Sequence, residues 1–198
     1  MRATAESPRM FESDFFDAFT RTPWWTVPLF WLPGSAAFAA AGVLVGGVSV
    51  GAAVALFIAG WFSWTLAEYW LHRTFFHWKP DTSWGPRMHF MVHGVHHDWV
   101  FDKYRLVMPP AVSLILCGLF FGLWYALLGS WSWTFMGGFI FGYLIYDMVH
   151  YATHHLKLKN SWFQALKKHH LLHHHSPKHK ERKFGVSTQL WDVVFRTN

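Results

Sequence analysis

The chain has 198 residues, of which 53% are hydrophobic, 20% aromatic and only 14% charged, and its formal net charge is +6. This composition excludes a disordered chain, and the single cysteine, Cys117, excludes a scaffold of intramolecular disulfides. The 15 histidines outnumber the 11 acidic residues, and together with the apolar composition this favours a membrane protein with a metal site. Nucleic-acid binding is the competing interpretation of the positive charge, but it would require the basic residues to form a patch on a soluble fold.

Residues 1–26 form an N-terminal segment ahead of the apolar part of the chain. Acidic residues interrupt phenylalanines at helical spacing there, which argues against a secretory signal and predicts a short amphipathic helix on the membrane surface. The acids are Glu12, Asp14 and Asp17, and the phenylalanines are Phe11, Phe15, Phe16 and Phe19.

Two long stretches without a formal charge follow, 22–67 and 106–146. About 20 helical residues cross a hydrocarbon core of about 30 Å, so each stretch is long enough for two spans. Gly46–Ser49 and Gly129–Ser132 supply a turn near the middle of each. We therefore expect an all-α integral membrane fold with four transmembrane helices in two hairpins, rather than two very apolar soluble hairpins. The expected spans are about 27–46, 50–71, 110–128 and 132–151, and a cytoplasmic helical cap, 72–109 and 152–198, completes one domain over 27–198.

The positive charges predict the orientation in the membrane. All 17 lysines and arginines lie before the first span, between the second and third, or after the fourth. By the positive-inside rule this side is cytoplasmic, so both termini and the cap are expected there.

The histidines also avoid the two uncharged stretches and stand at or beyond the cytoplasmic ends of the spans. Some are spaced i, i+4 or i, i+3, i+4, so their imidazoles share a helix face and can converge on a cation. His72 and His77 are five apart, which fits a helix that frays into a loop better than a regular turn. The helically spaced sets are His150 and His154; His93, His96 and His97; and His170, His173 and His174.

Neutral imidazole binds iron, zinc, copper and nickel. One interfacial histidine is commonly only an amphipathic residue, and a terminal histidine run can be an adventitious chelator. Four groups on one membrane face favour a metal site instead. The histidines outside the pattern are treated as bystanders: His89, His155, His169, His175 and His179.

Four segments resemble the histidine boxes of the fatty acid hydroxylase superfamily of integral-membrane di-metal enzymes. In chain order they are His72–His77 (HRxxFH), His93–His97 (HGxHH), Asp147–His155 (DxxHYxxHH) and His170–His174 (HxxHH). Within the superfamily, Asp102–Pro110 and the ending Phe184–Phe195 look most like the fatty-acid (sphingolipid) 2-hydroxylases.

The resemblance implies a ligand set and an activity. It implies two iron ions, with zinc able to occupy the same imidazoles in a purified protein. It also implies an O₂-dependent oxygenase that hydroxylates a long-chain acyl lipid at carbon 2 and takes electrons from a separate donor, cytochrome b5-like or a ferredoxin with its reductase. The implied ligands are His72, His77, His93, His96, His97, His150, His154, His170, His173 and His174.

Two acids stand near the implied ligands. Glu68 precedes His72 by one helical turn, and Asp147 precedes His150 by three residues. Either carboxylate can accept the free imidazole N–H and fix the ring, or can be an interfacial residue in contact with water. No catalytic residue is expected beyond the ligands and these two acids.

Other functions stay open on the sequence alone. The four boxes do not separate acyl 2-hydroxylation from a sterol or carotenoid hydroxylase or desaturase of the same superfamily. A membrane metal transporter or a metal-storage protein is the rival from another class. A transporter, however, places its ligands near the middle of the bilayer, where this sequence has no histidine or acid.

Overall fold

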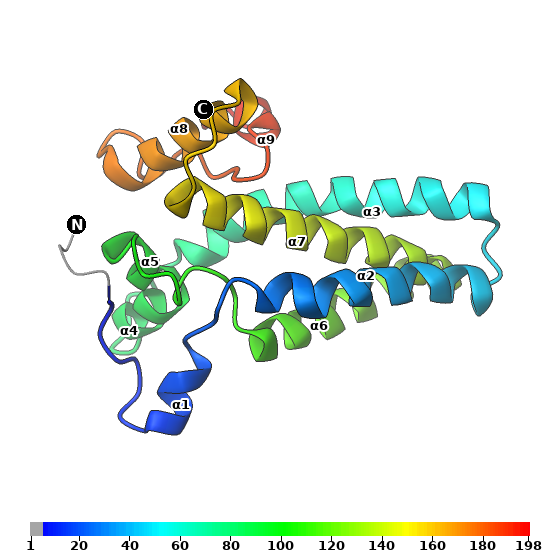
Figure 1. Ribbon diagram of the computed structural model, residues 1–198, viewed down its shortest axis with the longest axis horizontal. Helices are drawn as coiled ribbons and strands as arrows, with labels where there is room; N and C mark the ends of the chain where they lie inside the picture. The colour runs from blue at the N-terminus through cyan, green and yellow to red at the C-terminus, as the bar shows by residue number, and fades with distance from the viewer. Residues whose placement is uncertain (1–5) are drawn as a thin grey trace. The chain divides into compact units, whose positions relative to one another are not determined.

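The computed structural model describes residues 6–198, and every regular element in that range is helical (Figure 1). The all-α expectation is thereby confirmed for these residues. The bounds of the long helices follow the expected ones closely, except that the last helix runs on to His155. The four long helices are α2 (Thr26–Leu44), α3 (Val50–Trp70), α6 (Pro110–Leu128) and α7 (Ser132–His155).

Three stretches are long and apolar enough, by length and composition, to cross a membrane: Thr26–Leu44, Val50–Phe76 and Pro110–His155. The third has 46 residues and contains both α6 and α7. On α6, Ile115 and Leu119 are both 66% exposed, which suits side chains that face lipid rather than water. These helices indicate a multi-pass membrane protein.

Glycines end α2 and α6 at the two predicted turns. Gly47 lies between α2 and α3 with a φ of 67°, and Gly129 follows α6 with a φ of 57°. This left-handed conformation is the one that glycine adopts without a steric penalty. A short 3₁₀ helix, η3 (Gly129–Trp131), then leads into α7.

The contacts divide the chain into two compact units. We call Trp25–Leu66 with Met108–Asp147 the apolar unit, and the described part of Met1–Trp24 with Ala67–Val107 and Met148–Asn198 the histidine unit. The division into an N-terminal segment and one domain from residue 27 stays a prediction.

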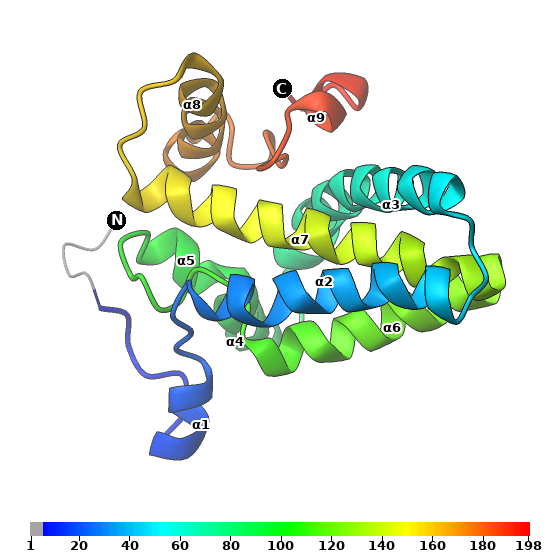
Figure 2. The same ribbon diagram turned by 45° about the vertical axis from the view of Figure 1, so that its right-hand side comes forward.

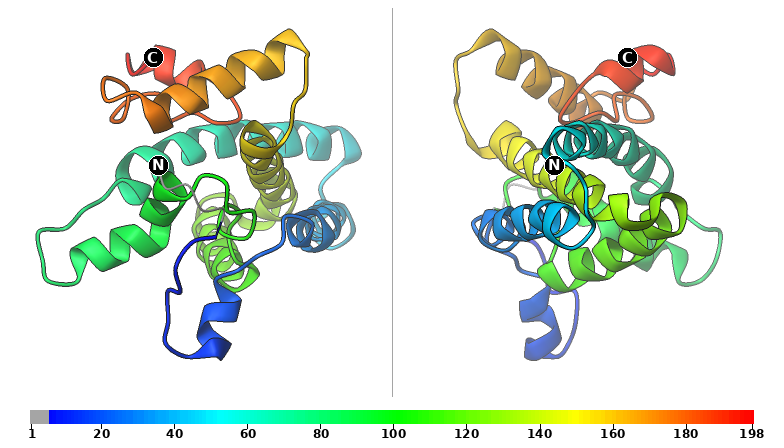
Figure 3. Two further views of the ribbon diagram at one scale, coloured as in Figure 1. Left: turned by 60° about the vertical axis from the view of Figure 1, so that its left-hand side comes forward. Right: turned by 90° about the vertical axis from the view of Figure 1, so that its right-hand side faces the viewer.

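In the apolar unit the long helices run side by side (Figures 2 and 3). Glycines bring the backbones of α3 and α7 together, because a Cβ on Gly60 would overlap the carbonyl of Phe135, and one on Gly138 the carbonyl of Phe57. Close approach at small residues is the usual way for helices to pack in a membrane, where no hydrophobic effect drives them together.

Two hydrogen bonds add polar ties to α2 within this unit. The Ser35 hydroxyl donates to the Gly137 carbonyl on α7 at 2.8 Å, and the Trp31 indole N–H donates to the Ser113 hydroxyl on α6 at 3.2 Å. Each satisfies a polar group that would otherwise be costly in an apolar environment.

The histidine unit consists of shorter helices and the loops between them. Its largest helix, α8, begins after Asn160, whose side chain caps it by accepting the Phe163 N–H at 2.8 Å. The helices that lie wholly in this unit are α1 (Asp14–Phe19), η1 (Leu71–Phe76), α4 (Gly85–His89), η2 (Phe90–Gly94), α5 (Val95–Asp98), α8 (Ser161–His175) and α9 (Leu190–Val194).

The N-terminal segment is attached to this unit by buried polar contacts. The Arg105 guanidinium donates to the Asp17 carboxylate at 3.0 Å, and the Ser7 hydroxyl donates to Asp102 at 2.6 Å. The predicted short helix is present as α1, while its contact with a membrane surface stays a prediction. Its outward phenylalanines are 57–65% exposed: Phe15, Phe16 and Phe19.

Candidate metal centre

Ten histidines of the histidine unit gather into two groups of five. In each group, one ring nitrogen per residue lies within 4.8 Å of every other. The structure thus brings together the ten residues that the sequence singled out as ligands. The first group is His72, His77, His93, His97 and His173; the second is His96, His150, His154, His170 and His174.

Two of the four boxes serve both groups. On α8, His170 and His174 belong to the second group, while His173 belongs to the first. The i+3 and i+4 positions of an α-helix point about 100° apart, so one helix can present ligands to two neighbouring ions. The expectation that a helically spaced set can converge on one cation is confirmed for His150 and His154, which share a group, and is corrected for the other two sets, which are divided between the groups. The two groups adjoin where the His97 and His174 rings stack, with their centroids 4.1 Å apart.

The pair His72 and His77 comes together through a wide helical turn. η1 is a π-helix, in which residue i bonds to residue i+5 and residues five apart face the same way. The two ring centroids are 5.1 Å apart. The helix therefore ends in a wide π-turn at Phe76, with His77 as its cap residue ahead of an irregular segment, and the five-residue spacing follows from this ending and not from a regular α-turn.

The distances between ring nitrogens fit a metal ion in each group. The Nε2 atoms of His72 and His93 are 3.1 Å apart, and those of His154 and His170 are 2.8 Å apart. Metal–nitrogen bonds of about 2.1 Å place adjacent ligand nitrogens about 3.0 Å apart and opposite ones about 4.2 Å apart. The buried Nε2 of His97 has no hydrogen-bond partner within residues 6–198, and a metal would satisfy it.

Backbone carbonyls orient two ligands of the first group. The Nδ1–H of His72 donates to the Phe184 carbonyl at 2.6 Å, and that of His173 donates to the Arg182 carbonyl at 2.7 Å. With the proton on Nδ1, the lone pair of Nε2 points at the centre of the group, as metal binding requires. No side-chain pattern in the sequence reveals these partners, because every residue has a carbonyl.

Sequence reasoning also missed Asp192, a fully buried acid on α9. Its carboxylate accepts four hydrogen bonds, and although burial raises its pKa, the bonds from His169 and Thr197 hold that pKa below the usual value. The one signal was a charge inside the apolar ending of the chain. The donors are Phe184 N (2.9 Å), Gly185 N (2.8 Å), His169 Nε2 (3.0 Å) and Thr197 Oγ1 (2.7 Å).

Several imidazoles of the two histidine groups are held in the neutral form that metal ligation needs. Burial, with repulsion from His173, lowers the pKa of His77 to about 3, and burial lowers that of His173 to about 4. Burial and the neighbouring imidazoles likewise keep the pKa of His93, His96 and His170 well below the usual value.

The two acids near the ligands contact backbone amides. The carboxylate of Glu68 accepts from the N–H groups of Val186 (3.2 Å) and Ser187 (2.9 Å), while both ring nitrogens of His72 face other partners. Glu68 thus holds the loop that follows Phe184, whose carbonyl accepts the His72 Nδ1–H, and its own role beside the ligands stays a prediction. Asp147 is buried and accepts from Met108 N at 3.4 Å; its role beside the ligands stays a prediction.

None of the five remaining histidines belongs to either group within the described chain. His169 is nevertheless buried on Asp192, so it is a structural residue and not a mere bystander. His179 contacts the Ser176 hydroxyl at 2.9 Å. The rings of His155 and His175 lie beside those of the ligands His154 and His174, with centroids 6.3 Å and 5.9 Å apart.

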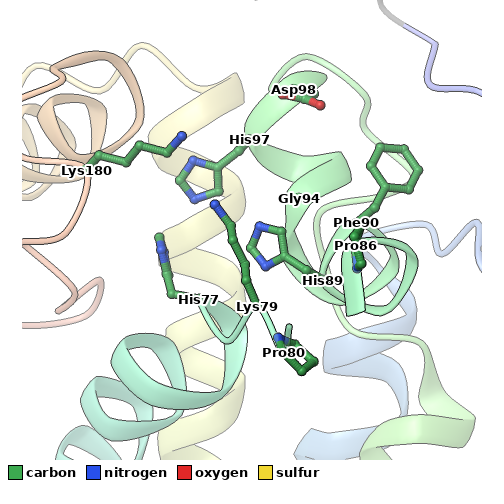
Figure 4. Close-up of a pocket in the computed structure, with 10 residues that line it drawn as sticks. All are labelled: His77, Lys79, Pro80, Pro86, His89, Phe90, Gly94, His97, Asp98 and Lys180. Atoms are coloured by element: carbon green, nitrogen blue, oxygen red, sulfur yellow. The ribbon is translucent and has the colours of Figure 1, made fainter. Parts of the chain in front are cut away.

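His89 lines a cavity of about 370 Å³ that reaches the first group (Figure 4). The ligands His77 and His97 also line it, and the side chains of Lys79 and Lys180 extend toward them. Both ammonium groups add to the lowering of the His77 pKa by burial and His173. The cavity is therefore a positively charged opening onto two of the ligands.

Comparison with known proteins finds one matching family and several similar proteins. The family model described as fatty acid hydroxylase matches residues 57–197. The chain is 40% identical over 196 residues to dihydroceramide fatty acyl 2-hydroxylase FAH1 of Arabidopsis thaliana, with 98% of this chain and 81% of that protein covered. It is 43% identical to the ceramide very long chain fatty acid hydroxylase SCS7 of Saccharomyces cerevisiae over 93% of this chain, and spans 48% of that protein.

A human protein and a solved structure agree with these matches. The chain is 34% identical to the human fatty acid 2-hydroxylase, of which it spans 56% and which covers 96% of this chain. The structure of full-length scs7p, in which only the hydroxylase domain is visible, superposes with a TM-score of 0.86 at 41% identity. That match covers 93% of this chain and 69% of the other.

Proposed function

The chain belongs to the fatty acid hydroxylase family, and on that premise we propose that it hydroxylates carbon 2 of a long acyl chain, in a fatty acid or an N-acyl sphingolipid. The observation that carries this proposal is the pair of five-histidine groups in a chain similar to acyl 2-hydroxylases along almost all of its length. The substrate is a membrane lipid, so its tail lies in the same hydrocarbon layer as the apolar helices.

The ten histidines hold two metal ions, which we propose to be iron. Zinc fits the imidazoles but has no redox chemistry. Two bound iron ions supply, with O₂ and electrons, the oxidant that an unactivated C–H bond requires. The chain's own residues keep the imidazoles neutral, fix His72 and His173 through backbone carbonyls, and bury six of the ten ligand side chains.

We propose four membrane spans, with the 46-residue stretch crossing twice as α6 and α7. All lysines and arginines then fall in the segments on one side of the membrane, the side that also carries both termini and the histidine groups. By the positive-inside rule this side is cytoplasmic. Reporter fusions test this arrangement. At Gly47, only a reporter enzyme that works outside the cytoplasm should be active. At the C-terminus, only a reporter that works in the cytoplasm should be active.

The electrons come from a separate donor, cytochrome b5-like or a ferredoxin with its reductase. The cavity beside His77 and His97 supports entry at this face, because it exposes two ligand rings between two lysines. A donor with an acidic surface around its redox group complements that charge.

The direct experiment is production of the protein with iron in a host that has a working reductase, followed by mass spectrometry of the lipids. Acyl species heavier by one oxygen atom, labelled from ¹⁸O₂ at carbon 2, are expected. His96→Ala and His173→Ala should each abolish the product while the protein still inserts into the membrane. Absence of labelled product from the unmodified chain would contradict the proposal.

A further inference from the structure

The two histidine groups differ in what holds the far side of their rings. In the first group, His72 and His173 donate their Nδ1–H to the carbonyls of Phe184 and Arg182. In the second group, Nδ1 of His170 and of His174 are buried with no hydrogen-bond partner in residues 6–198. The backbone carbonyls of Phe184 and Arg182 therefore orient ligands of the first group.

In the loop that carries these two carbonyls, one side chain accepts two consecutive backbone N–H groups. Asp192 accepts the N–H groups of Phe184 and Gly185, the residues next to the His72 contact. The backbone of Thr197 also returns to the loop, since its carbonyl accepts the Lys183 N–H at 2.7 Å and its own N–H donates to the Asp192 carbonyl at 2.7 Å. These bonds fix residues 183–185 from both sides.

Asp192 is itself connected to α8, which carries three ligands, and to the end of α3, which precedes the ligand His72. His169, which precedes the ligand-bearing part of α8, donates to it at 3.0 Å. The Thr197 hydroxyl donates to it at 2.7 Å and lies 3.0 Å from the hydroxyl of Tyr69, which is near the end of α3. Asp192 thus links α3, α8 and the loop at one buried point.

We propose, building on the proposed function, that Asp192 is a positioning residue for the first histidine group only. Without its carboxylate, the 182–185 loop loses the hydrogen bonds at Phe184 N and Gly185 N, and the carbonyls that aim the Nε2 atoms of His72 and His173 are no longer held in place. Loss of outer hydrogen-bond partners costs about 10–100-fold in metal affinity. The second group has no contact with this loop among the hydrogen bonds described above and keeps its metal.

The test compares Asp192→Asn with Asp102→Asn, a matched removal of one buried carboxylate charge at the N-terminal contact. Each protein is loaded with iron, and with cobalt in parallel, and metal per chain is measured before and after a timed chelator challenge. Asp192→Asn should retain about one metal where the unmodified chain and Asp102→Asn retain two. In the Asp192→Asn background, His72→Ala should remove no further metal, whereas His150→Ala should remove the remaining one.

Several results would overturn the inference. They are equal retention by Asp192→Asn and the unmodified chain, equal loss from both groups, and selective loss from the second. If the unmodified chain binds no metal at all, the proposed function fails and not this inference alone. Should Asp192→Asn not fold, Thr197→Val removes one of the four hydrogen bonds together with the Tyr69 contact, and decides the matter by faster chelator loss of one metal than of the other.

Discussion

His96 and His97 are neighbours in the chain, yet they belong to different histidine groups. His97→Ala should therefore remove the metal of the first group and His96→Ala that of the second, leaving about one metal per chain in each case. The double variant should bind none. Metal content per purified chain measures this, with His175→Ala as a control outside both groups. Loss of both metals from either single variant would show that the two groups act as one site.

The buried imidazoles make the stability of the metal-free protein depend on pH. The pKa of His77 is lowered to about 3 and that of His173 to about 4, by burial first, against about 6.5 in the unfolded chain. At a pH between the folded-state and unfolded-state pKa values, the unfolded chain binds more protons than the folded one, so the free energy of unfolding falls as the pH drops below about 6.5. Above about pH 6.5 these two histidines do not lower the free energy of unfolding. Thermal unfolding of the metal-free protein in detergent, from pH 8 to pH 5, should show this fall. The variant with both His77→Gln and His173→Gln should show a shallower one, and an unchanged unfolding temperature in the unmodified chain would contradict the expectation.

At the scale of the helices, glycine packing between α3 and α7 sets how closely they approach. Gly138→Ala places a methyl group against the Phe57 carbonyl, and forced overpacking of this kind costs about 1–3 kcal/mol. Gly118→Ala on α6 is the matched control, because no atom lies within 4 Å of its Cβ position and alanine favours the helix by up to about 1 kcal/mol. Unfolding in detergent should rank Gly138→Ala below the unmodified chain and Gly118→Ala at or above it. Equal stability of the two variants would mean that the close contact is not limiting.

The sequence predicts the helices and the ligand candidates well because both depend on local periodicity. Charge-free length and the turn glycines place α2, α3, α6 and α7. Histidine spacing identifies eight of the ten residues that gather, and the resemblance to the histidine boxes adds His72 and His77. The way these residues divide into two groups depends on helix rotation, which spacing alone leaves undetermined. The π-turn of η1 and the carbonyls of Arg182 and Phe184 are backbone features that any residue can supply. Asp192 stays hidden because its partners are loop amides, His169 and Thr197, which only the folded chain assembles.

For the whole molecule, electrons from the proposed donor must reach metal sites whose ligands are mostly buried. The cavity lined by His77 and His97 is the opening onto the first group described above, and Lys79 and Lys180 stand at it with Asp98 as the opposing charge (Figure 4). An acidic donor is attracted to such a site, and attraction of this kind raises association rates by about 10- to 1,000-fold at low salt. Entry at this face therefore makes the rate of reduction sensitive to two lysines that bind no metal.

The variant carrying Lys79→Glu and Lys180→Glu should accordingly be reduced by soluble reduced cytochrome b5 about tenfold or more slowly at low salt, with a weaker dependence on ionic strength. The variant with Lys157→Glu and Lys159→Glu, at two exposed lysines outside the cavity lining, is the control for the same change in net charge and should leave the rate nearly unaltered. A small chemical reductant such as dithionite needs no docking surface, so it should reduce all three proteins alike. Stopped-flow absorbance of the cytochrome measures the first rate, and metal content per chain confirms that the sites stay loaded. If the control slows as much as the variant at Lys79 and Lys180, the effect is one of total charge, and the donor enters elsewhere.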